Sequence, residues 1–169
     1  MALPASNRQV LIARLSVALV VACIVAGSLW YGFSPEVKQR IWQDLADRPG
    51  GPMTFRFILQ PAMAALAALR DGVEDAKTGR SPYVWTLLDD RAKRGQRLWE
   101  GVISTSRIIL LGLVMDAVYQ AMVLDTFYPG EAAIVALLLA FVPYLLLRGP
   151  FARIARWWLE HKSGGKTAT

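Results

Sequence analysis

Cysteine and histidine are almost missing from this chain of 169 residues. The one cysteine, Cys23, excludes a disulfide within the chain, and the one histidine, His161, excludes a histidine-based metal site in a single copy. We therefore expect no metal ion and no cofactor. The only clustered hydroxyls, at 104–106, have no base beside them in the sequence, so we expect no catalytic residues and no enzyme.

Charge is missing from three long stretches: Leu15 to Phe33, Ile108 to Leu124 apart from Asp116, and Ala132 to Leu147. Each is long enough to cross a bilayer, and 54% of all residues are hydrophobic. In lipid every backbone polar group must be paired within the protein, which favours helices as the spanning elements. The sequence therefore predicts an all-α integral membrane protein with three transmembrane helices.

A fourth uncharged stretch, 57–69, is shorter than a typical span. Apolar residues form one stripe along it, and Arg56, Gln60 and Asp71 fall on the opposite face, which predicts an amphipathic helix at the membrane surface or a re-entrant helix. The chain has four spans if this stretch crosses. The side of the membrane on which the N-terminus lies depends on that choice, which the sequence leaves open.

We expect one membrane domain, 1–169, built from successive helical segments. They are a first span at 15–33, the amphipathic or re-entrant helix at 54–78, a basic juxtamembrane helix at 82–106, a transmembrane hairpin at 107–127 and 131–148, and an interfacial helix at 151–161.

Basic residues give the orientation of the hairpin. The connection 125–131 has two acids and no basic residue, whereas arginines precede the first hairpin helix and follow the second. Lysine and arginine accumulate on the cytoplasmic side, so we expect a multi-pass protein with its C-terminus in the cytoplasm.

The same basic residues are candidate contacts for anionic lipid or for a partner protein. No nucleic-acid-binding motif accompanies them, so we expect no nucleic-acid partner. The candidates are Arg91, Lys93, Arg94, Arg97, Arg107, Arg148, Arg153 and Arg156.

A candidate polar site lies within the predicted hairpin. Gly112, Asp116 and Gln120 recur every four residues, and small residues recur at the same spacing on the last span, which allows close helix packing. Pro143 frees the carbonyl of Leu139, and we expect a protonated Asp116 to donate a hydrogen bond to it. Two interpretations stay open: polar contacts that hold the helices together, or a proton or cation site.

From about Phe55 onward the chain resembles small bacterial inner-membrane proteins of unknown function. The resemblance implies a bacterial inner membrane and no particular activity. It rests on the segments 55–61, 70–72, 116 with 119–120, 128–131 and 143–150.

These observations favour a non-enzymatic accessory or scaffold component of the inner membrane. Its expected partners are the lipid bilayer, with anionic lipids at the basic helices, and either another protein or further copies of this chain. The alternative function is a proton- or ion-conducting oligomer that uses Asp116 and Gln120.

Overall fold

The computed structural model describes residues 5–32, 34–47, 50, 54–81, 83–124 and 126–164, and within these ranges the chain forms helices and no strands. Residues 33, 82 and 125, which belong to three of the predicted segments, lie outside the described residues. The helices are α1 (Asn7–Tyr31), α2 (Pro35–Asp47), α3 (Arg56–Lys77), α4 (Tyr83–Asp89), α5 (Arg91–Val123) and α6 (Pro129–Gly164).

Three of these helices, α1, α5 and α6, are long and apolar enough to cross a membrane, which confirms the expectation of three candidate spans. The first starts earlier than predicted because Ser6 and Gln9 form a capping box at its N-terminus. It ends at Gly32, whose φ of 70° is a conformation that favours glycine.

The basic helix and the first hairpin helix, predicted as separate segments, are one continuous helix, α5. The break lies earlier, at Asp90, whose side chain accepts hydrogen bonds from the backbone nitrogens of Ala92 and Lys93. Aspartate at this position stabilises a new helix start, which separates α4 from α5.

The predicted separation between the last span and the interfacial helix is also wrong. Helix α6 runs through Pro143 and Pro150 without ending. Pro150 removes one backbone hydrogen bond, but the helix on both sides of it is held against α3, where Gly72 lies next to the backbone of Arg148 and Ala152.

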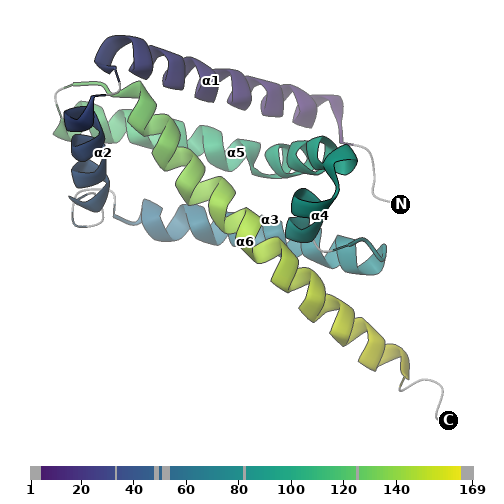
Figure 1. Cartoon of the computed structure of the whole chain (residues 1–169). Helices are drawn as coiled ribbons and strands as arrows, with labels where there is room; N and C mark the ends of the chain where they lie inside the picture. Colours follow the sequence, from purple (N-terminus) through teal and green to yellow (C-terminus); the bar gives the residue numbers. More distant parts are fainter. Residues whose placement is uncertain are drawn as a thin grey trace.

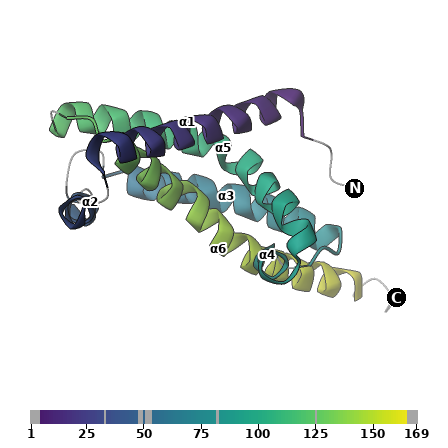
Figure 2. The same cartoon turned by 45° about the horizontal axis from the view of Figure 1, so that its top comes forward.

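Helix α6 is the centre of the bundle and contacts α1, α3, α4 and α5. It crosses these helices diagonally in both views (Figures 1 and 2). Small residues allow the close approach, because Ala132, Ala136 and Ala140 are buried on α6 and a Cβ on Gly112 of α5 would lie 3.1 Å from the Cβ of Ala136. Helix α2, which was not predicted, lies at the end of the bundle where α6 begins (Figure 1).

The contact between α3 and α6 at Gly72 leads to a stability prediction. A Cβ at this position would lie 2.9 Å from the carbonyl oxygen of Arg148 and 3.0 Å from the backbone nitrogen of Ala152, so Gly72→Ala is expected to destabilise the protein by about 1–3 kcal/mol. Gly95→Ala is the matched control, because its Cβ would meet no heavy atom within 4 Å and the change should stabilise α5 by about 0.5–1 kcal/mol. Thermal unfolding in detergent measures both, and equal effects would contradict the close contact.

Candidate functional site

The first polar cluster joins the start of α3 to α5. Arg56 and Asp116 are 1% and 0% exposed, and the Nη2 of Arg56 donates to the Oδ1 of Asp116 at 2.5 Å. The other carboxylate oxygen accepts a hydrogen bond from Gln120 Nε2. Asp116 is therefore the acid of a buried ion pair, and the expectation that it is a neutral donor without a counter-charge is wrong.

The register of the hairpin explains why the predicted carbonyl partner was misplaced. The contact between Gly112 and Ala136 sets the two antiparallel helices in register. One turn further along α5 corresponds to one turn back along α6, so Asp116 lies at the level of Ala132 rather than Leu139. Of the four residues of the predicted polar site, Gly112, Asp116 and Gln120 come together, whereas Pro143 is half-buried about three turns of α6 from the level of Asp116.

Gln120 connects this cluster to the turn between α5 and α6. Its Nε2 donates to the carbonyl oxygen of Tyr128 at 3.2 Å, and its Oε1 accepts from the backbone nitrogen of the same residue at 2.5 Å. The side-chain amide of Gln120 thus forms hydrogen bonds with both backbone groups of Tyr128 and also contacts the carboxylate of Asp116.

Three buried atoms beside the ion pair have no hydrogen-bonding partner among the described residues. They are Nε and Nη1 of Arg56 and Oε1 of Gln60. Buried polar groups without partners are costly, so this part of the interior is less well satisfied than the rest of the cluster.

A second cluster is centred on Asp75 of α3, which is 2% exposed. Its carboxylate accepts from Arg97 Nη1 on α5 at 3.1 Å and from Nε and Nη2 of Arg148 on α6 at 2.8 and 3.0 Å. One buried acid therefore holds three helices together. Both arginines were predicted to contact lipid or a partner, and that expectation is wrong for them because each is buried against Asp75.

Tyrosines extend the second cluster. Arg148 donates to the hydroxyl of Tyr144, which donates to Asp71, and Ser104 donates to the same carboxylate oxygen. The guanidinium of Arg148 also lies 4.2 Å from the ring centre of Tyr83, a cation–π contact.

Tyr83 is fully buried at the start of α4 and donates to the carbonyl oxygen of Arg97 at 2.6 Å. Burial raises the pKa of Tyr83 to about 12, against the opposing effect of Arg148 and Arg97. The hydroxyl therefore remains protonated and able to donate at neutral pH.

The remaining basic candidates lie outward. Arg156 is half-buried and donates to the carbonyl oxygen of Arg80 at 2.8 Å, and Lys93 pairs with Asp90 at 2.9 Å. The exposed residues among the candidates are Arg91, Lys93, Arg94, Arg107 and Arg153.

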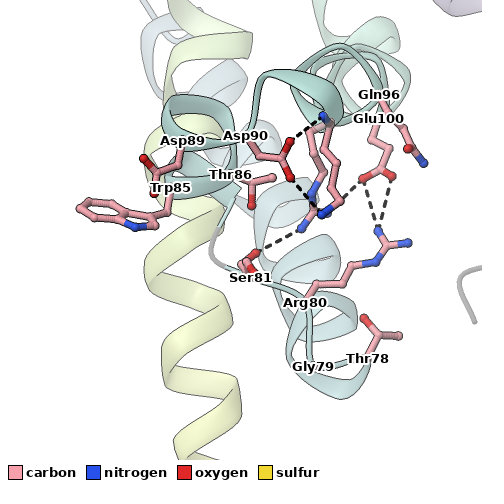
Figure 3. A pocket seen from close by; sticks show the side chains of 12 residues that line it. Thr78, Gly79, Arg80, Ser81, Trp85, Thr86, Asp89, Asp90, Gln96 and Glu100 are labelled. Carbon is pink, nitrogen blue, oxygen red and sulfur yellow. Dashed lines mark hydrogen bonds and ion pairs between the residues drawn. The ribbon is translucent and has the colours of Figure 1, made fainter.

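A polar pocket of about 520 Å³ opens beside the second cluster, between the end of α3, α4 and the start of α5. Figure 3 shows Arg80 and Glu100 facing each other at its wall, where Arg80 Nη1 lies 3.4 Å from both carboxylate oxygens. Arg97 bonds Glu100 on its other side at 3.2 Å. Arg80, Glu100 and Arg97 therefore alternate in charge along this wall of the pocket. Among the described residues, no group of three or more histidine, cysteine or acidic side chains is placed to hold a metal ion.

Arg56, Asp75 and Tyr83 were not predicted from the sequence as members of a site. A signal was present for Asp75, because it lies one turn beyond Asp71 on the polar face of α3 that Arg56 and Gln60 begin.

Comparison with protein-family models, with curated proteins and with solved structures finds no match for this chain.

Proposed function

We propose that this chain is a non-enzymatic accessory or scaffold protein of a bacterial inner membrane, with a closed interior and a basic surface that binds lipid or a partner protein. The observation that carries the proposal is that the buried acids Asp116 and Asp75 are each paired with arginine from another helix. Such pairs hold a bundle in one arrangement.

The packing between the two clusters supports a structural rather than a conducting role. Ser104 and Asp116 are twelve residues apart on α5, about 18 Å at 1.5 Å per residue. A tightly packed apolar layer fills this distance, formed by Ile108, Ile109 and Leu113 of α5, Ala64 and Ala68 of α3, and Ala136 and Ala140 of α6. None of these seven residues has a titratable side chain that could pass a proton between the clusters.

Proteoliposomes test the closed interior. With a pH gradient imposed, the parent protein is expected to show no more proton flux than protein-free liposomes, because the apolar layer separates the clusters. The control for a sealed, responsive preparation is addition of a known proton ionophore. Proton flux in the parent that is lost in a stably folded Asp116→Asn variant would replace this proposal with conduction.

Purification from native membranes in mild detergent tests the accessory role. We expect a second protein to remain with this chain at a fixed ratio. A preparation that contains only copies of this chain, together with proton flux, would again support conduction.

The exposed basic residues support anionic lipid as one partner of the same surface. Arg91→Glu and Arg153→Glu are each expected to weaken binding of a fluorescent anionic phospholipid by about 1 kcal/mol, or roughly fivefold, because each removes a cation from the surface. Arg91→Lys and Arg153→Lys keep the charge and should bind as the parent does. Equal binding by the Glu variants in nanodiscs would show that the surface does not select lipid charge.

A further inference from the structure

Helix α3 has its polar side inside the bundle and its apolar side outside. Arg56, Gln60 and Asp75 are 1%, 0% and 2% exposed, whereas Ile58 and Leu66 are 74% and 67% exposed. An amphipathic helix on a protein surrounded by water shows the reverse arrangement. The outer face of α3 is therefore suited to an apolar environment.

Helix α3 also has the position and length of a span. It contacts both α6 and α5. It runs antiparallel to α5, since Arg56 at its start pairs with Asp116 and Asp75 near its end pairs with Arg97. Nineteen residues separate the members of each set along their helix, about 29 Å at 1.5 Å per residue, close to a hydrocarbon core of about 30 Å. The exposed Arg70 and Arg107 lie within this length, so a spanning α3 requires both guanidinium groups to extend toward the head groups.

The first helix fits the same arrangement. The hydroxyl of Tyr31 at the end of α1 donates to the carbonyl oxygen of Phe127 at 2.9 Å, and Gly27 lies against Gly130. The end of α1 therefore meets the turn between α5 and α6, and the start of α1 lies at the other end of the bundle, where the C-terminal part of α6 also lies (Figure 1).

We propose that α3 is a fourth membrane-spanning helix whose exposed apolar face contacts lipid acyl chains. The start of α1, the end of α3 and the end of α6 then share one side, and α2 and the start of α6 share the other. Continuity with the lipid-facing side of α5 identifies the occupant, since Leu111 and Val114 are 36% and 62% exposed along the same length of the bundle.

Single-cysteine labelling tests the crossing. In a Cys23→Ala background, Gly50→Cys and Gly95→Cys flank α3, and neither added Cβ would meet a heavy atom within 4 Å. A membrane-impermeant maleimide applied to intact cells is expected to label one of the two and to label the other only after permeabilisation. Thr126→Cys should react as Gly50→Cys does, and Ala5→Cys as Gly95→Cys does. Reaction of Gly50→Cys and Gly95→Cys from the same side would overturn the fourth crossing.

Fluorescence quenching tests what covers the outer face of α3. A fluorophore on Leu66→Cys in liposomes is expected to be quenched by phospholipids with a nitroxide on the acyl chain, as strongly as the same fluorophore on Val114→Cys of α5, and to resist aqueous iodide. Iodide quenching would place α3 at the membrane surface. Loss of acyl-chain quenching at Leu66→Cys alone would mean that a second copy or another protein covers this face.

Discussion

Asp116→Leu is expected to destabilise the protein by about 3–5 kcal/mol, because it leaves the guanidinium of Arg56 buried and without its counter-charge. Gln120 would lose the carboxylate that its amide contacts, so the turn at Tyr128 should loosen as well. Equilibrium unfolding in mixed micelles, followed by circular dichroism, measures the change.

A double-mutant cycle separates the ion pair from simple packing. Arg56→Met combined with Asp116→Leu removes both charges and should recover most of the stability that either single change loses. Asp116→Asn is also informative. The hypothesis of a neutral Asp116 predicts a nearly unchanged protein, whereas the ion pair predicts a clear loss, so parental stability in Asp116→Asn would contradict the pairing with Arg56.

A loss of similar size, about 3–5 kcal/mol, is expected for Asp75→Ala, because this acid neutralises two buried arginines, Arg97 and Arg148. The change should separate the end of α3, the start of α5 and the middle of α6, and hydrogen exchange followed by mass spectrometry should show faster exchange in all three.

Asp89→Asn is the matched control for Asp75→Ala, since it removes an exposed acid from the same end of the bundle. It should change stability by no more than about 0.5 kcal/mol. Equal losses in the two variants would mean that the network around Asp75 does not hold the helices.

Residue pattern alone was enough to predict the elements that depend on local hydrophobicity. The apolar stretches predicted α1, α5 and α6 as candidate spans. Gly112 on α5 and the alanines that recur every four residues on α6 predicted the close contact between α5 and α6. These features are visible because the residues that produce them are neighbours on one helix.

The charge pairs were not predictable in the same way. The segment from Arg91 to Arg97 contains no acid, and the next acid along the chain is Glu100. The sequence therefore favoured contact of these basic residues with solvent or lipid. The acid that pairs with Arg97 comes from another helix, 22 residues away, and the same acid pairs with Arg148 at a separation of 73 residues. Ion pairs between helices depend on which helices pack together. The periodicity of residues along one helix does not show which helices pack together.

The order of synthesis gives the polar face of α3 a further consequence. Arg56 leaves the ribosome 60 residues before Asp116, and Asp75 leaves 73 residues before Arg148. Helix α3 is therefore complete while the charges that neutralise it are still missing, and entering lipid at that moment would expose an unpaired guanidinium and an unpaired carboxylate to hydrocarbon. In the proposed four-span topology, stable insertion of α3 therefore has to wait until α5 and α6 supply Asp116, Arg97 and Arg148.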